Sequence, residues 1–480
     1  MAILFNQDKN FKERVDVAVN NEFKQNAIRT AQNVFYSKRK ELVDQVDEWQ
    51  DFRQEAADLR DHVLANLDYY LNQFAENAEK NGCKVYFAQT DKEASAQVLE
   101  IFKAKQAKML VKSKSMMTEE IDLNHVLLEA GIEVNETDLA ESILQTADWD
   151  PPSHIVVPAL HFERKAIRKI FNEKLGYEGT EDPEEMTRFV RKRMRERFLK
   201  ADIGVTGCNF AVAETGTMTL VSNEGNGRMS TSIPNTQVVI LGMERIVPSF
   251  EALDVMMELL IRSSVGAKIS NYFSMVTGPR KADEVDGPEE VHIVIVDNGR
   301  SKIIASQFRE MLRCIRCGAC MNICPVYRHI TGHAYGSIYP GPMGAVLTPL
   351  LVGYEKAGAL PYASTLCGAC TDHCPVKIPI HELLLLHRQK LVEEFHYPGF
   401  MEKSIFKVAG MGLGSSGMFD FGTKMGAFGM GIMGGKKGRL GEGTKGIPVL
   451  GGWTKSRDME LLKKEKFRDW FEKREKGGRK

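Results

Sequence analysis

Hydrophobic positions change their spacing along the chain, and each change predicts a different structural region. Residues 1–70 are charged and place apolar side chains at helical intervals, as at Val43, Val46, Trp49 and Phe52. This spacing predicts an amphipathic helical lead-in. The lead-in contains no motif that indicates chemistry.

Short β-rich runs alternate with helical stretches from about residue 84 to residue 300. The predicted strands are 84–88, 108–111, 155–157, 217–221, 237–241 and 291–296. A helical segment from Lys92 to Lys105 follows the first strand, and Asp182-Pro183 predicts a helix that runs toward Lys200. Alternation of this kind favours an α/β domain with a largely parallel sheet, which we place at residues 71–300.

A cysteine-rich segment follows, flanked by helical patterns at 303–312 and 379–394. We place this helical domain at residues 301–395. Residues 410–452 then contain 16 of the 41 glycines, interspersed with methionine. Because each glycine weakens a helix by ~1 kcal/mol relative to alanine, we expect residues 396–480 to be a loosely ordered Gly/Met-rich and basic region that ends in a charged helix.

The formal charge is zero, with 64 Lys and Arg against 64 Asp and Glu. Neutrality argues against nucleic acid as a partner of the whole protein. It hides opposite local charges, because residues 115–150 hold ten acidic side chains and no Lys or Arg, whereas residues 188–200 hold seven basic side chains and one acid. Residues 436–480 carry 15 basic and seven acidic side chains. These segments are either solvated helix faces or docking surfaces for partner subunits.

No targeting or membrane-spanning pattern is visible. Residues 1–8 have no basic start followed by a long apolar run, and no apolar run approaches the ~20 residues that cross a bilayer. We therefore expect a cytoplasmic protein without a transmembrane segment. Peripheral contact of the Gly/Met-rich region with a membrane surface stays open.

Cysteine spacing gives the strongest indication of chemistry. Seven of the nine cysteines fall between Cys314 and Cys374, at gaps of two and three residues within two groups. Such spacing in a reducing compartment indicates metal binding rather than a disulfide framework. The remaining two, Cys83 and Cys208, have no cysteine nearby and are expected to be small buried hydrophobes.

The first motif is C-x2-C-x2-C-x3-C-P, formed by Cys314, Cys317, Cys320 and Cys324, with Pro325 after them. Three thiolates on a tight loop can hold three irons of one cubane cluster, while the fourth cysteine of such a motif ligates a second cluster. A zinc site normally closes with four ligands and rarely shows this run. Redox clusters are favoured over clusters that only brace the fold.

The second motif contains Cys367, Cys370 and Cys374, and Ser364 stands where its first cysteine would be. By the crossing rule, Cys374 joins the first three cysteines of the first motif in cluster 1. Cluster 2 takes Cys324, Cys367 and Cys370 and lacks an obvious fourth thiolate. Ser364, His373, water or a three-iron cluster are the open alternatives. We thus expect two [4Fe–4S] clusters, the second incompletely ligated by cysteine or of the [3Fe–4S] type.

Polar loops flank the predicted strand 217–221, and one of them carries Arg228. A guanidinium can bind a carboxylate through two hydrogen bonds, so Arg228 is a candidate ligand for a small anionic substrate. Tight turns without a ligand explain these loops about as well. No catalytic residue is predicted.

Several of these segments together resemble a known family. The Lys112-Ser-Lys-Ser-Met116 run, the Phe210-to-Thr217 run and Gly225-Asn-Gly-Arg228 are similar to the LUD domain. The two cysteine motifs and the glycine-rich region follow in the order seen in the lactate utilization protein B family. The resemblance implies a NagB/RpiA/CoA-transferase-like α/β domain and an iron–sulfur protein, acting as an electron carrier in the oxidation of L-lactate to pyruvate during growth on lactate. It also implies lactate utilization proteins A and C as complex partners.

Three functional hypotheses follow. The first is an electron-transfer subunit that passes electrons from lactate through two clusters to an unknown acceptor. The second is an enzyme whose LUD domain itself binds or oxidises the hydroxy acid, with Arg228 anchoring the carboxylate. The third is an assembly scaffold that the clusters hold in shape.

Overall fold

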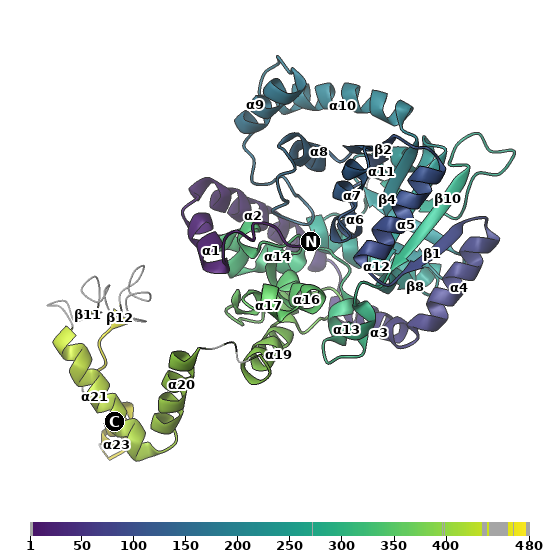
Figure 1. Cartoon of the computed structure of the whole chain (residues 1–480). Helices are drawn as coiled ribbons and strands as arrows, with labels where there is room; N and C mark the ends of the chain where they lie inside the picture. The colour runs from purple at the N-terminus through teal and green to yellow at the C-terminus, as the bar shows by residue number, and fades with distance from the viewer. Residues whose placement is uncertain are drawn as a thin grey trace. The chain divides into compact units, whose positions relative to one another are not determined.

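A six-stranded parallel sheet forms the centre of the α/β region in the computed structural model, which describes residues 3–270, 272–395, 397, 399–433, 439–440, 459–463 and 465–476 (Figure 1). In spatial order the strands are β1 (Lys84–Ala88), β10 (Glu290–Val296), β7 (Thr236–Gly242), β4 (Ile203–Gly207), β2 (Met109–Lys112) and β3 (Glu133–Glu136). Every neighbouring pair is parallel. The predicted α/β architecture is confirmed.

Both faces of this sheet are covered, which explains its nearly continuous apolar strands. Val238 and Ile240 of β7 face α5 (Asp91–Ala104) and α7 (Leu123–Glu129). Val239 and Leu241 face the opposite side, toward α4 (Leu67–Lys80) and a smaller sheet. The smaller sheet has the order β8 (Ile246–Val247), β5 (Phe210–Val212), β6 (Thr217–Ser222) and β9 (Tyr272–Val276).

Three of the central strands end in elements that point toward the cysteine segment. Strand β2 leads into α6 (Met116–Glu120), β7 into the 3-10 turn η1 (Met243–Arg245), and β10 into α13 (Arg300–Ile304). Because the carboxyl ends of parallel strands meet at one edge of a sheet, these elements gather there.

The remaining helices of the α/β region lie on its flanks. They are α8 (Leu139–Thr146), α9 (Arg164–Leu175), α10 (Pro183–Lys200), α11 (Asn226–Ser232) and α12 (Phe250–Val265). Helix α10 begins after the Asp182 cap, as predicted. Residues 155–157, predicted as a strand, instead lie in an irregular loop that covers the first cysteine motif.

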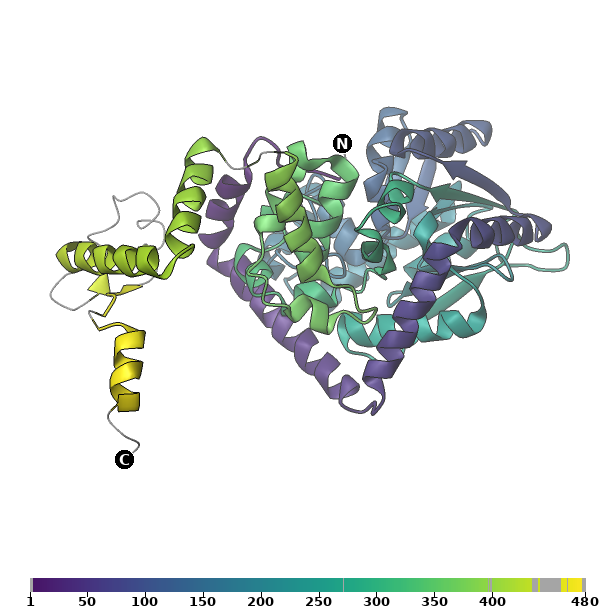
Figure 2. The same ribbon diagram turned by 90° about the horizontal axis from the view of Figure 1, so that it is seen from below.

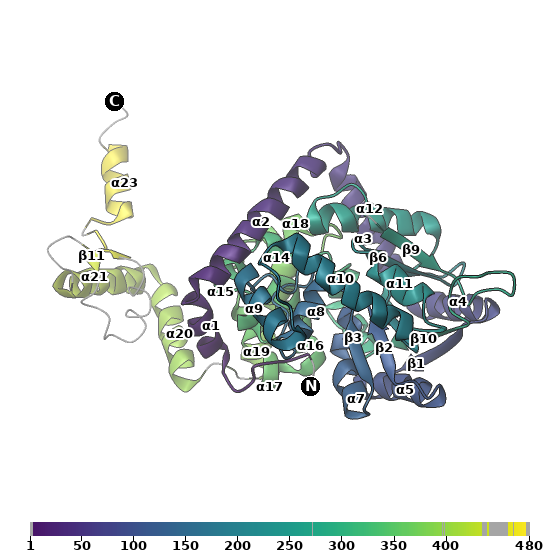
Figure 3. The same ribbon diagram turned by 90° about the horizontal axis from the view of Figure 1, so that it is seen from above.

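The N-terminal helices share one hydrophobic core with the cysteine segment. They are α1 (Phe11–Val19), α2 (Glu22–Val43) and α3 (Trp49–Ala65). Figure 2 shows the two long helices meeting in a V, and Figure 3 shows α2 running beside the cysteine-bearing helices. Buried Ile28, Trp49 and Ala56 pack in the same cluster as Cys317 and Cys320. The N-terminal helices therefore pack against the cysteine segment and form part of its hydrophobic core.

Short helices make up the cysteine segment. They are η2 (Arg309–Arg313), α14 (Ala319–Ile323), α15 (Pro325–Ile330), η3 (His333–Tyr335), α16 (Gly341–Val352), α17 (Tyr354–Ala357), η4 (Leu360–Tyr362), α18 (Ala369–His373) and α19 (Ile380–Glu393). The predicted helix over 379–394 is present as α19. The predicted helix over 303–312 is broken between α13 and η2.

Residues 396–480 form a second compact unit. Its described elements are α20 (Phe400–Leu413), α21 (Ser416–Met433), β11 (Arg439–Leu440), β12 (Met459–Glu460) and α23 (Phe467–Lys476). Residues 400–413 and 416–433 are helical despite their glycines, so the expected weakening of helices does not hold there. The predicted charged helix near the end is present as α23. Most of the glycine-rich stretch from 434 to 452 lies outside the described residues.

Among the described residues, no helix combines the length and apolar character that spanning a membrane requires.

Candidate metal centre

The first cysteine loop makes a tight turn, because two of its residues adopt positive φ. Arg316 has φ +60° and Gly318 has φ +78°, and α14 begins immediately after them. The helix ends at Cys324, and Pro325 starts the next helix. This geometry turns Cys317 and Cys320 inward, where both are buried.

One cavity is lined by four cysteines, namely Cys314, Cys317, Cys320 and Cys374. These are the four residues predicted for cluster 1. The rest of its lining is mainly apolar, formed by Ile155, Ile315, Gly318, Met343, Pro375, Val376, Ile378, Ile380 and the stem of Arg316. A thiol-lined cavity with apolar walls suits a cluster that must be shielded from water.

The other three motif cysteines, Cys324, Cys367 and Cys370, do not line this cavity. Burial raises the pKa of Cys370 to about 12, with Cys324 and Cys367 raising it further. Burial also raises the pKa of Cys324, and the nearby Cys367 adds to this increase. Cys367 is exposed, whereas Cys324 and Cys370 are buried. The assignment of these three cysteines to a second cluster stays a prediction from their spacing.

Burial also dominates the pKa values of the first set. It raises the pKa of Cys317 to about 12 and that of Cys374 to about 11, and the neighbouring thiolates add to both shifts. The thiols therefore need a compensating cation before they ionise, which is what a bound metal supplies.

Side chains from the N-terminal helices bind the backbone of both cysteine loops. Gln32 donates from Nε2 to the carbonyls of Met321 (2.7 Å) and Cys324 (3.2 Å). Arg39 donates to the His373 carbonyl at 3.0 Å, and Arg53 donates to the Cys374 carbonyl at 2.9 Å. All three donors satisfy carbonyls at the helix ends, and the two arginines also place positive charge beside Cys317 and Cys374.

Sequence reasoning missed these N-terminal residues. The available signal was the position of Arg53 and Arg60, seven residues apart on the buried face of α3 beside Ala56 and Ala57. Charged side chains at core-facing positions are rare unless they have partners. Arg60 meets that condition by donating to the carbonyls of Ile246 and Leu312, each at 3.0 Å.

A buried ionic network joins the strand ends to the first cysteine loop. Arg300 binds both oxygens of Glu120, at 2.7 and 2.9 Å, and Glu244 at 2.6 Å. Glu244 also lies 3.6 Å from Arg316, the residue before Cys317. The Arg316 guanidinium lies over the Tyr339 ring, 4.8 Å from its centroid. The network therefore fixes the α/β sheet to the cysteine loop.

A buried hydroxyl without a partner supports the presence of clusters. Tyr335 is fully buried, and its Oη has no hydrogen-bond partner in the described structure. Burial and the nearby Cys324, Cys320 and Cys370 raise its pKa. An unpaired buried hydroxyl is costly, and cluster sulfur is an acceptor that would satisfy it. The residues present therefore fit iron–sulfur clusters.

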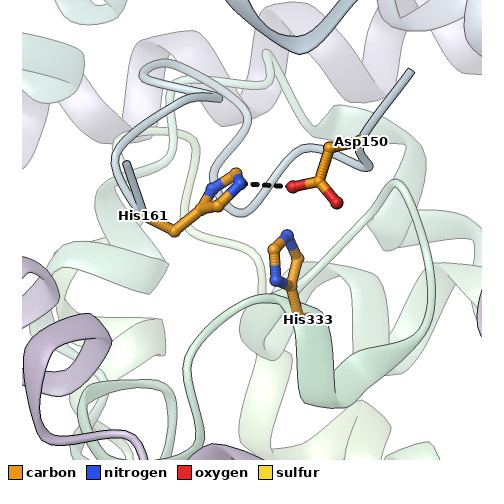
Figure 4. Close-up of side chains that lie close together, drawn as sticks. All are labelled: Asp150, His161 and His333. Carbon is orange, nitrogen blue, oxygen red and sulfur yellow. Dashed lines mark hydrogen bonds and ion pairs between the residues drawn. The ribbon is translucent and has the colours of Figure 1, made fainter. Parts of the chain in front are cut away.

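Asp150, His161 and His333 form a second group with potential ligand atoms, all within 4.8 Å of one another (Figure 4). Each ring nitrogen already has a protein partner. His161 pairs with Asp150 at 2.7 Å and with the hydroxyl of Ser153 at 2.9 Å.

The two nitrogens of His333 pair with the Pro151 carbonyl at 2.8 Å and with Lys24 at 3.2 Å. Burial, His161 and Lys24 lower the pKa of His333 to about 4, so its ring is neutral. The hydrogen bonds of this group therefore connect the covering loop, η3 and α2.

Arg228, the predicted anion ligand, is exposed on α11. The described structure gives its side chain no hydrogen bond or ion pair, and its role stays a prediction. The two isolated cysteines, Cys83 and Cys208, are buried and half-buried, and neither lines the cysteine cavity. All nine cysteines lie among the described residues, and none of them forms a disulfide.

Two family models match the chain. The LUD domain matches residues 71–296, and the 4Fe-4S dicluster domain matches residues 310–378. Proteins named lactate utilization protein B from Bacillus thuringiensis (strain Al Hakam), Bacillus cereus (strain AH187) and Bacillus anthracis (strain A0248) are each 52% identical over 471 residues, covering 98% of both chains.

The chain belongs to the lactate utilization protein B family. Membership confirms the predicted fold class, a LUD α/β domain followed by a dicluster segment, and two [4Fe–4S] clusters as its cofactors. Among solved structures, a DUF162 family protein from Deinococcus radiodurans is similar at 14% identity and a TM-score of 0.28, covering 48% of this chain and 98% of that one.

Proposed function

We propose that this protein is the electron-transfer subunit of a system that oxidises L-lactate to pyruvate. The observation that carries the proposal is the pair of cysteine groups held in one core with the LUD domain. The names of the relatives supply the substrate. Lactate utilization proteins A and C are the proposed complex partners, on the strength of the family resemblance.

The ligand sets follow the two cysteine groups. Cys314, Cys317, Cys320 and Cys374 hold cluster 1, and Cys324, Cys367 and Cys370 contribute to cluster 2. When bound, each [4Fe–4S] cluster supplies a one-electron couple. Oxidation of lactate to pyruvate releases two electrons and two protons, so one chain has capacity for the electrons of one lactate.

The different exposure of the two groups gives each a role. A Cβ added at Gly318, in the first loop, would meet Val156 and His154 of the covering loop, whereas one added at Gly368, in the second, would meet nothing within 4 Å. Cys367 is also exposed. Because electron transfer requires close approach, we infer that the second group faces the redox partner while the first lies against the LUD domain.

The test compares Cys317→Ser with Cys83→Ser in the full chain, assembled anaerobically with proteins A and C. Cys83 is buried but lies outside both groups, so its replacement controls for a general packing defect. We expect Cys317→Ser to lose the signal of cluster 1 and lactate-dependent reduction, and Cys83→Ser to keep both. Unchanged lactate oxidation in the Cys317→Ser complex would contradict the proposal.

A further inference from the structure

The two cysteine loops are structural repeats of each other. Residues 314–325 and 364–375 share the spacing of their cysteines, a glycine–alanine pair and a terminal proline at an offset of 50 residues. Each glycine starts a five-residue helix, α14 in one loop and α18 in the other. Each helix ends at a cysteine, Cys324 or Cys374, with ψ 121° or 120°.

The repeat extends to the strained positions. Arg316 and Leu366 are non-glycine residues in the left-handed region, with φ +60° and +55°. Gly318 and Gly368 have φ +78° and +80°. Because residues with side chains rarely adopt positive φ, this agreement shows that the two loops follow one backbone path.

Ser364 stands in the second loop where Cys314 stands in the first. The N–H of Arg316 donates to Cys314 Sγ at 3.4 Å, and the N–H of Leu366 donates to Ser364 Oγ at 3.1 Å. In both loops, the backbone N–H of the residue two positions later in the chain thus donates to the side-chain sulfur or oxygen at position 314 or 364. Such a donor stabilises an anionic ligand atom.

The crossed pairing of the repeats completes the comparison. Cys314 lines the first cavity together with Cys374, the last cysteine of the opposite loop. If the second group repeats this crossed arrangement, Ser364 pairs with Cys324, the last cysteine of the first loop. Arg388 fixes the backbone at this point, donating to the Ser364 carbonyl at 2.8 Å and to the Pro361 carbonyl at 3.0 Å.

His373, the other protein candidate, is engaged elsewhere. Its ring stacks on Tyr36 of α2, with the centroids 5.6 Å apart. The backbone carbonyl of His373 accepts a hydrogen bond from Arg39, also of α2, at 3.0 Å. Its surroundings therefore belong to the N-terminal helices and not to the second cysteine group.

We propose that Ser364 Oγ is the fourth protein ligand of cluster 2. The hydroxyl proton leaves to solvent as the oxygen–iron bond forms, and no electron is transferred in this step. The proposal rests on the ligand sets of the proposed function. It assigns cluster 2 three thiolates and one alkoxide, against four thiolates for cluster 1.

The experiment measures iron content and Mössbauer spectra of the full chain, reconstituted anaerobically with ⁵⁷Fe and sulfide. We expect about eight irons per chain in wild type, which two complete clusters require, and one iron site with an oxygen ligand. Ser364→Ala should lose or shift that one site, ending near seven irons or with an altered spectrum. Ser364→Cys should keep eight irons and convert the site to sulfur ligation.

Thr365→Ala is the matched control, because Thr365 is adjacent and exposed. It should leave iron content and spectra unchanged. A Ser364→Ala protein with an unaltered spectrum, or a wild-type protein that holds seven irons under excess iron and sulfide, would overturn the assignment. Neither readout uses lactate, so failure of this proposal is distinguishable from failure of the proposed electron-transfer role.

Discussion

Glu244 joins Arg300 of the ionic network to Arg316 of the cysteine loop, and Glu244→Gln tests that connection. Burial alone would raise the pKa of Glu244, but Arg300, Arg245 and Arg316 lower it from 4.5 to about 2. Glutamine keeps the size and shape of the neutral carboxyl. The variant therefore loses the part of the stability that comes from ionisation.

Linkage gives the magnitude. A carboxyl whose pKa falls from 4.5 in the unfolded chain to about 2 in the folded chain contributes about 3 kcal/mol at pH 7. Because the folded pKa is the lower one, this contribution is present above pH 4.5 and is lost as the pH falls toward 2. The stability gap between wild type and Glu244→Gln should therefore stay nearly constant from pH 7 to about pH 5.

Anaerobic urea unfolding, followed through tryptophan fluorescence and circular dichroism, measures the gap. With a slope of about 3 kcal/mol per molar urea, the midpoint should fall by roughly 1 M. The control is Glu173→Gln, which removes an exposed pair with Lys169 at 3.8 Å and should cost less than about 0.5 kcal/mol. Equal midpoints for the two variants would refute the network's role.

Three further predictions concern the loops, the buried tyrosines and the LUD domain. Gly318→Ala and Gly368→Ala both place alanine at positive φ, at a cost of about 1 kcal/mol, but only the first brings a Cβ within 3.2 Å of Val156. Iron release to a chelator should be faster in Gly318→Ala, and equal rates would argue against that contact. Tyr335→Phe should lower a cluster midpoint potential by roughly 20–60 mV, the value of one hydrogen bond, in an EPR-monitored titration. Tyr327→Phe should not, because that hydroxyl donates to the Ser153 carbonyl at 2.6 Å, and equal shifts would contradict the unpaired state of Tyr335. If the LUD domain anchors lactate, calorimetry should detect binding by the wild-type chain that Arg228→Ala weakens at least tenfold, whereas no wild-type binding would exclude the anchor.

Local patterns were sufficient to predict the elements whose burial is periodic. Strands β1, β6, β7 and β10 and helices α5, α10 and α19 are present near their predicted bounds. The exceptions have physical causes. Ile155 is apolar because it lines the cysteine cavity from a loop, not because it belongs to a sheet.

Contacts between distant segments could not be predicted from local spacing. The cysteine groups were predictable because cluster ligation imposes fixed gaps on one short stretch. The donors around them were not, because Gln32 and Arg53 reach the loops from helices about 300 residues earlier in the chain. Local spacing also could not predict the ion pair between Arg300 and Glu120, because only the folding of the sheet brings these two residues together.

Electron transfer from lactate through the two clusters is tested most directly by adding L-lactate to the proposed complex with proteins A and C. The mixture is kept anaerobic and without an external acceptor, and EPR counts the electrons on this chain. We expect reduction of both clusters, up to two electrons per chain, matched by one pyruvate. Clusters that stay oxidised while pyruvate accumulates would contradict it.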